Sequence, residues 1–173
     1  TALFYLEYGH FKGRKFHLDD VTGPDEYTAL VNDNYYTNKM AQKHMFFITK
    51  YIEEHQEETL PILKRLKVRK KDLYLLNRAA RSMTLLVNKA KHVIKQDSSF
   101  MDKKELELTS IPKENFPLLT NYHPLFIYRH QVLKQADAVL AMVLCGEDDL
   151  KIYRKTFDYY LKRTTHDSSL SKC

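Results

Sequence analysis

A polar loop near the start of the chain gathers side chains that can bind or cleave a sugar. Residues 19–34 contain carboxylates a few positions apart, among them Asp19, Asp20, Asp25 and Glu26. Sugar hydroxyls need hydrogen-bond partners, the ring face packs on aromatic groups, and glycosidic cleavage needs a carboxylic acid. Asp and Asn also supply the hard oxygen ligands of calcium, although the EF-hand spacing is absent. Taken alone, the segment is best explained as a solvated acidic loop.

Two further polar segments lie later in the chain. Residues 96–100 read Gln-Asp-Ser-Ser-Phe, and residues 165–171 read Thr-His-Asp-Ser-Ser-Leu-Ser. The second segment is rich in hydroxyl groups, and an ordinary helix N-cap needs the same residue types. The two cysteines, Cys145 and Cys173, form neither a disulfide framework nor a metal-ligand spacing, so we expect no metal.

The elements that must position these loops are mostly helical. Apolar residues recur every three or four positions over 36–55, and residues 150–161 follow an acidic cap, which predicts two helices. Pro124 at a first turn and Gly146 as a stop predict a third helix running to about Leu144. On that helix Lys134 and Gln135 would form an ordinary exposed pair. Function is expected in the loops 19–34, 96–100 and 164–171.

Composition and charge narrow the function classes. The apolar share of 43% suffices for a core, and four Gly and five Pro argue against a turn-rich β-sandwich. The net charge of +6 is concentrated in Lys64–Lys71, which lacks the interleaved aromatics of a nucleic-acid reader. We therefore expect no nucleic-acid partner, and a helical module that binds polyanions is the non-enzymatic alternative. No apolar run approaches the ~20 residues of a membrane span, and no leader peptide is visible, which predicts a cytoplasmic protein without membrane association.

Several segments, taken together, resemble glycoside hydrolase family 65. They occur in the family's order and span nearly the whole chain. The family contains inverting maltose, trehalose, kojibiose and nigerose phosphorylases. The matching segments are Val21–Tyr27, Val31–Asn38, Gln96–Phe100, His123–Leu125, Tyr128–Asp137 and Thr165–Ser171.

The resemblance assigns the central catalytic role to Glu26. This residue matches the general acid, which protonates the glycosidic oxygen as the bond breaks. Such an acid must hold its proton near neutral pH. The pKa of Glu26 is therefore expected to be raised, by burial or by the neighbouring charge of Asp25.

The resemblance also implies two groups of binding residues. The sugar is expected to contact an adjacent Lys-Gln pair and the neighbours of the acid, namely Lys134, Gln135, Asp25 and Tyr27. Phosphate is expected to bind the loop that contains His166, Ser168 and Ser169.

The function implied is inverting phosphorolysis of an α-glucosyl disaccharide to β-glucose 1-phosphate and glucose. Phosphate is the nucleophile and co-substrate, no cofactor is needed, and the full-length enzyme is expected to be a homodimer. An inverting α-glucoside hydrolase of the same family is the enzymatic alternative. After Tyr27 the chain reads Thr-Ala-Leu where maltose-specific members continue with His and Asn, which resembles the kojibiose or nigerose type more.

The fold implied is all-α: the second portion of an (α/α)6 barrel, with short irregular or β-hairpin pieces in its loops. Residues 1–173 would then be a partial catalytic domain. An N-terminal β-sandwich, the first part of the barrel and a C-terminal β-domain would lie outside this chain. We therefore expect the chain alone to be inactive and to leave apolar helix faces uncovered.

Overall fold

The computed structural model describes residues 2–167, which fall into two compact units. Within this range, unit 1 comprises residues 2–19 and 38–85, and unit 2 comprises residues 20–37 and 86–167. The longest helix, α2 (Tyr35–Glu54), starts in unit 2 and continues in unit 1.

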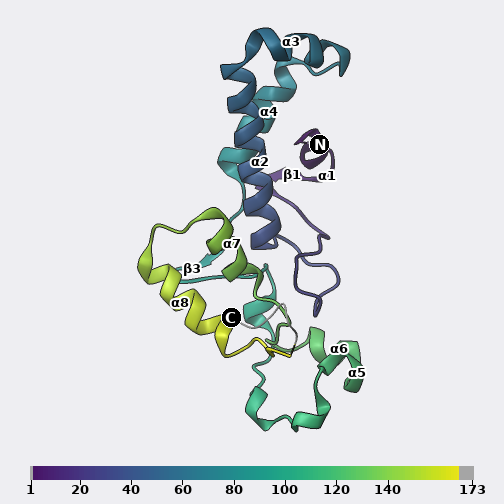
Figure 1. Ribbon diagram of the computed structural model, residues 1–173, viewed down its shortest axis with the longest axis vertical. Coiled ribbons are helices and arrows are strands. Elements are labelled where there is room, and N and C mark those ends of the chain that lie inside the picture. Colours follow the sequence, from purple (N-terminus) through teal and green to yellow (C-terminus); the bar gives the residue numbers. More distant parts are fainter. Residues whose placement is uncertain (1, 168–173) are drawn as a thin grey trace. The chain divides into compact units, whose positions relative to one another are not determined.

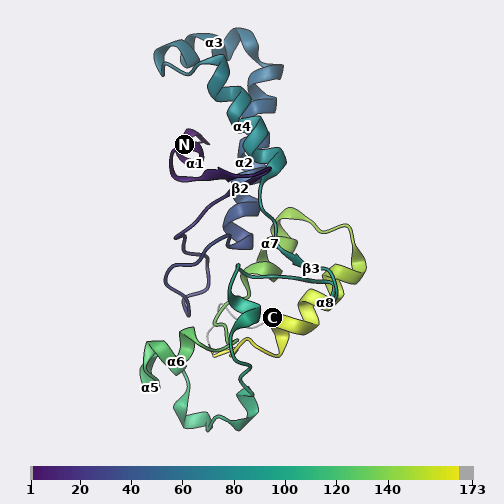
Figure 2. The ribbon, with the colours of Figure 1, turned by 180° about the vertical axis from the view of Figure 1, so that it is seen from behind.

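Unit 1 is built from helices and one hairpin (Figure 1). Besides α2, its elements are α1 (Ala2–Tyr8), β1 (His10–Lys12), β2 (Lys15–His17), α3 (Gln56–Arg65) and α4 (Lys70–Ser82). The hairpin places Phe11 opposite Phe16, and Gly13 turns the chain with a φ of 59°, a conformation that favours glycine. Helices α2 and α4 lie side by side in both views (Figure 1 and Figure 2), and the Gln42 side chain donates to the Ala80 carbonyl at 2.9 Å.

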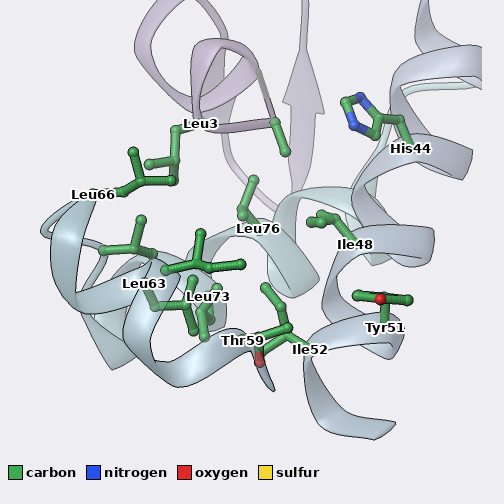
Figure 3. A pocket seen from close by; sticks show the side chains of 13 residues that line it. Leu3, His44, Ile48, Tyr51, Ile52, Thr59, Leu63, Leu66, Leu73 and Leu76 are labelled. Carbon is green, nitrogen blue, oxygen red and sulfur yellow. The ribbon is translucent and has the colours of Figure 1, made fainter. Parts of the chain in front are cut away.

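Unit 1 also contains an apolar hollow of about 310 Å³ between α1, α2, α3 and α4 (Figure 3). Aliphatic side chains such as Ile48, Leu63 and Leu76 line it, together with the rings of His44 and Tyr51. None of its lining residues carries a carboxylate. The hollow therefore contains no carboxyl group.

Unit 2 combines short helices with long irregular segments. Its strands are β3 (Val87–Asn88) and β4 (Val93–Ile94), and its α-helices are α5 (Leu118–Asn121), α6 (Pro124–Tyr128), α7 (Asp137–Cys145) and α8 (Leu150–Leu161). Three 3-10 turns complete it: η1 (Phe100–Asp102), η2 (Leu108–Ser110) and η3 (Lys113–Asn115). Helix α8 packs against α7 and β4, where the buried Tyr160 hydroxyl donates to the Ile94 carbonyl at 2.8 Å.

The sequence predictions for the main helices and for the acidic loop are confirmed. The chain is mostly helical, α2 lies where apolar periodicity placed it, α8 follows an acidic cap as predicted, and the hairpins are short. Residues 19–34 contain no helix, and backbone hydrogen bonds between Val21 and Val31 close the loop at 2.9 Å in both directions. No helix within residues 2–167 combines the length and apolar character that a membrane crossing requires.

The predicted continuous helix from Pro124 to about Leu144 is wrong. Helix α6 stops at Tyr128 and α7 starts only at Asp137. Residues 133–136 between them, called the clamp segment below, bond to another part of unit 2. Leu133 N–H donates to the Arg163 carbonyl and Leu133 C=O accepts from Thr165 N–H, both at 2.9 Å. These long-range bonds replace the helical ones, a competition that local periodicity does not reveal.

Candidate active site

The carboxylate of Glu26 is exposed at the surface of unit 2 and is held by two side chains of the clamp segment. Lys134 Nζ donates to Glu26 Oε2 at 2.7 Å, and Gln135 Nε2 donates to Glu26 Oε1 at 3.0 Å. The Glu26 backbone N–H donates back to Gln135 Oε1 at 3.3 Å. Glu26, Lys134 and Gln135, all predicted site residues, are thus in contact although more than 100 positions separate Glu26 from the other two.

The expected rise in the pKa of Glu26 is wrong for this structure. Hydrogen bonds from Lys134 and Gln135 lower the pKa of Glu26, because both donors favour the charged carboxylate. Its neighbour Asp25 does not face it as a repelling charge but points into the protein. The site as it stands therefore holds Glu26 as an anion.

Asp25 is buried, although the resemblance assigned it to sugar binding. Its Oδ1 accepts the backbone N–H groups of Lys134 at 2.9 Å, Gln135 at 3.2 Å and Tyr27 at 3.3 Å. Its Oδ2 accepts from Gln96 Nε2 at 3.2 Å. Burial raises the pKa of Asp25 to about 6, and the three backbone donors oppose that rise. Both oxygens are engaged inside the protein, so Asp25 organises the site from behind.

Tyr27, which the resemblance also assigned to sugar binding, is buried inside unit 2. Its ring packs in a cluster with residues such as Ile111 and Leu118. Its hydroxyl donates to Asp167 Oδ2 at 3.0 Å and accepts from Leu118 N–H at 3.3 Å. Burial raises its pKa to about 12. Tyr27, the residue after Glu26, is thus hydrogen-bonded to the loop that contains His166.

The predicted phosphate loop is described only in its first half. His166 has a φ of 53°, and its Nε2 lies 3.2 Å from the Leu161 carbonyl oxygen. Ser168 and Ser169 lie outside the described residues. The pairing of Leu133 with residues 163–165 attaches the start of this loop to the clamp segment. One segment therefore contacts both Glu26 and the chain that leads to the predicted phosphate site.

Behind Asp25 lies a buried polar network that sequence reasoning did not assign. Gln96 Oε1 accepts from the Asp137 N–H at 3.0 Å, and Asp137 Oδ2 accepts from Asn34 Nδ2 at 2.9 Å. Burial, and then the charge of Asp25, raise the pKa of Asp137 to about 8. Gln96 and Asp137 fall inside the matched segments, but nothing in a single sequence distinguished them from surface residues.

Gly23 is required beside this network because the backbone passes very close to it. A Cβ atom built on Gly23 would lie 2.0 Å from Asp137 Oδ2 and 2.5 Å from Asn34 Nδ2. Both distances are far below van der Waals contact. Gly23 thus allows the backbone to approach this network closely.

The alternative binding sites gain no support from the described residues. The basic run Lys64–Lys71 spans the end of α3 and the start of α4, and its charged side chains are exposed. Arg69 pairs with Asp72 at 3.0 Å, a contact that belongs to the start of α4. Among residues 2–167, no three His, Cys, Asp or Glu side chains are placed to share a metal ion.

Comparison of the chain with known proteins identifies its family. The model of the glycosyl hydrolase family 65 central catalytic domain matches residues 1–173. An alpha,alpha-trehalose phosphorylase of Geobacillus stearothermophilus is 43% identical over the whole chain, and a kojibiose phosphorylase of Halothermothrix orenii is 32% identical over 99% of it. A solved structure from the human microbiome, provisionally named kojibiose phosphorylase, superposes with a TM-score of 0.89 at 32% identity over 98% of the chain.

The chain spans only part of these proteins: 23% of the length of both curated relatives and 24% of the solved structure. The match nevertheless covers the acidic loop, the clamp segment and the start of the His166 loop. The chain belongs to glycosyl hydrolase family 65, within its central catalytic domain.

Proposed function

We propose that this chain supplies the general acid of an inverting disaccharide phosphorylase, with Glu26 in that role. The observation that carries the proposal is the exposed Glu26 carboxylate, held by Lys134 and Gln135 at 2.7 and 3.0 Å. The disaccharide phosphorylases among its relatives support the reaction class. Lys134 and Gln135 are the sugar-binding pair in this proposal, and the His166 loop with Ser168 and Ser169 holds phosphate.

The clamp on Glu26 has a direct consequence for catalysis. A carboxylate that accepts from Lys134 and Gln135 is stabilised as an anion and is a poor proton donor. In the complex, Lys134 and Gln135 donate to sugar hydroxyls instead, and this exchange releases Glu26 to bind a proton. Binding of the sugar and protonation of Glu26 then occur together, and Glu26 stays charged when no sugar is bound.

The reaction follows from this arrangement. A phosphate oxygen attacks the anomeric carbon from the face opposite the leaving sugar, and the glycosidic C–O bond breaks. Glu26 transfers its proton to the departing oxygen, which leaves as a glucose hydroxyl. The new bond has the opposite configuration, so an α-linkage yields β-glucose 1-phosphate. Phosphate enters already charged, so the reaction needs no second carboxylate to activate water.

Trehalose is the first substrate to test. The relatives named trehalose phosphorylase are 43% and 40% identical to this chain, against 32% for the Halothermothrix orenii kojibiose phosphorylase. This ranking supports testing trehalose before kojibiose or nigerose, the linkage types that Thr28–Leu30 favours by resemblance. Kojibiose, nigerose and maltose remain the comparison substrates.

We further propose that the chain forms part of an (α/α)6 barrel in a longer, cytoplasmic, homodimeric enzyme that uses no metal or organic cofactor. The short share of each relative that the chain covers supports a partial catalytic domain. In this arrangement the rest of the barrel completes the sugar site. The 173-residue chain alone should therefore show no turnover.

The decisive experiment measures products from the full-length protein that carries this chain. The protein is incubated with trehalose, kojibiose, nigerose or maltose, each with and without phosphate, and glucose and β-glucose 1-phosphate are quantified. Phosphate-dependent β-glucose 1-phosphate from one sugar supports the proposal. The Glu26→Gln variant should lower that turnover by about 10²- to 10⁴-fold, the usual contribution of general acid catalysis. Equal glucose release without phosphate would identify a hydrolase and refute phosphorolysis.

A further inference from the structure

The two donors that hold Glu26 are themselves fixed by Asp25. Oδ1 of Asp25 accepts the backbone N–H groups of Lys134 and Gln135 at 2.9 and 3.2 Å, and the side chain is 0% exposed. Asp25 also directly precedes Glu26 in the chain. One residue therefore anchors the backbone that carries the acid and the backbone that carries its two holders.

Gln96 completes the anchor on the far side of Asp25. Its Nε2 donates to Asp25 Oδ2 at 3.2 Å, and its Oε1 accepts from the N–H of Asp137 at 3.0 Å. Asp137 is the first residue of α7, where the clamp segment ends. The backbone N–H groups of residues 134, 135 and 137 thus all donate to Asp25 or Gln96. These two buried side chains set the non-helical path of the clamp segment.

We propose that Asp25, oriented by Gln96, is a positioning residue that aligns the acid Glu26 through the backbone of the clamp segment. The inference rests on the proposed phosphorolysis with Glu26 as general acid. Asp25 touches neither sugar nor phosphate in this scheme, because it is enclosed by protein and both of its oxygens accept internal hydrogen bonds. It acts through Lys134 and Gln135.

The substitution Asp25→Asn tests this role without opening a cavity. Asparagine keeps one oxygen for the backbone N–H groups, but its Nδ2 would face Nε2 of Gln96, donor against donor. Rotating the new asparagine amide relieves that contact but turns its NH2 group toward the N–H groups of the clamp segment. Rotating the Gln96 amide instead relieves it but loses the hydrogen bond from the Asp137 N–H. The clamp segment should therefore loosen. A misplacement of about 1 Å in a catalytic constellation costs up to about 100-fold in rate, so we expect a 10- to 100-fold loss of kcat, to order of magnitude.

The experiment compares two substrates of the full-length protein in the presence of phosphate: the disaccharide that the wild type cleaves, and α-glucosyl fluoride. Fluoride departs without a full proton, so its turnover depends little on a general acid. We expect Asp25→Asn to lower kcat on the disaccharide by this factor and kcat on the fluoride by no more than about threefold. In the Glu26→Gln background, Asp25→Asn should add little further loss, because residues that act as a unit are not additive.

Asp137→Asn is the matched control. It makes the same chemical change in an equally buried carboxylate, but the Asp137 side chain interacts with Asn34 and with the backbone of Asp25, not with the clamp segment. Any loss it causes should be equal for both substrates. If Asp25→Asn also lowers both turnovers equally, or adds its full effect to Glu26→Gln, Asp25 is merely structural and the inference is wrong.

Two further measurements keep the test decisive. If Asp25→Asn does not fold, as judged by circular dichroism, Gln96→Met removes the orienting contacts and should show a weaker form of the same substrate pattern. Amide hydrogen exchange measures the protection of the N–H groups of the clamp segment directly, without relying on turnover. Exchange at residues 134 and 135 should be about tenfold faster in Asp25→Asn, as expected for a loss of about 1.4 kcal/mol; unchanged exchange would overturn the inference. A wild type with no phosphate-dependent turnover would instead refute the proposed function, and the exchange data would still decide whether Asp25 holds the clamp segment.

Discussion

The buried carboxyl of Asp137 should make the stability of this protein depend steeply on pH. Its side chain is 0% exposed, and its Oδ1 accepts no hydrogen bond from the described residues. Burial, with the charge of Asp25, raises its pKa from 3.8 to about 8. A folded-state pKa above the unfolded value means that the native state binds the proton more tightly. Stability must therefore fall as the pH rises between about 4 and 8.

The size of this fall follows from linkage. A carboxyl with a pKa of 3.8 when unfolded and about 8 when folded loses roughly 4 kcal/mol of unfolding free energy between pH 5 and pH 8. Asp25, with its pKa raised to about 6, adds roughly 1 kcal/mol in the same direction. Such losses are a large fraction of the 5–15 kcal/mol that typically stabilises a domain, to order of magnitude.

The perturbation is Asp137→Asn, which mimics the neutral carboxyl at every pH. Asparagine keeps an oxygen for Asn34 Nδ2 and places an amide group where Oδ1 lies. The assay is urea unfolding of wild type and variant at pH 5 and pH 8, followed by circular dichroism. We expect the variant to gain stability relative to the wild type on going to pH 8, by up to roughly 4 kcal/mol. Equal pH dependence in the two proteins would refute the argument, because every other titrating group is common to both.

Two further predictions concern the neighbours of this network. Gly23→Ala should destabilise the protein by about 1–3 kcal/mol, the usual cost of overpacking, because its Cβ would lie 2.0 Å from Asp137 Oδ2; an unchanged midpoint of urea unfolding would contradict the close approach. Lys134→Met should raise the pKa of Glu26 in the ligand-free protein, because Lys134 is the largest cause of its lowering. Carboxyl ¹³C NMR, with Glu26→Gln to assign the signal, checks this shift, and a Glu26 titration that stays at the wild-type pH would show that the ion pair does not control the acid.

Local sequence patterns correctly predicted the positions of two helices. Helix α2 lies where recurring apolar residues placed it, because an amphipathic face is a local property of the chain. Helix α8 begins after an acidic cap, which is also a local signal. The family motifs also selected Glu26, Lys134 and Gln135, three residues that the structure brings within hydrogen-bonding distance. Composition and periodicity alone would have left all three as ordinary surface residues.

The tertiary structure decided the environment of each site residue. The clamp segment is not helical, because Leu133 and the two residues after it bond to partners that lie from about 30 to more than 100 positions away. The pKa of Glu26 falls where a rise was expected, and Asp25 is enclosed where a sugar contact was expected. Desolvation and long-range hydrogen bonds depend on which segments meet in space, and a single sequence records neither. The sequence by itself thus determined the family and singled out Glu26 as the predicted acid, whereas only the tertiary structure decided how the Glu26 carboxylate is charged and what holds it in place.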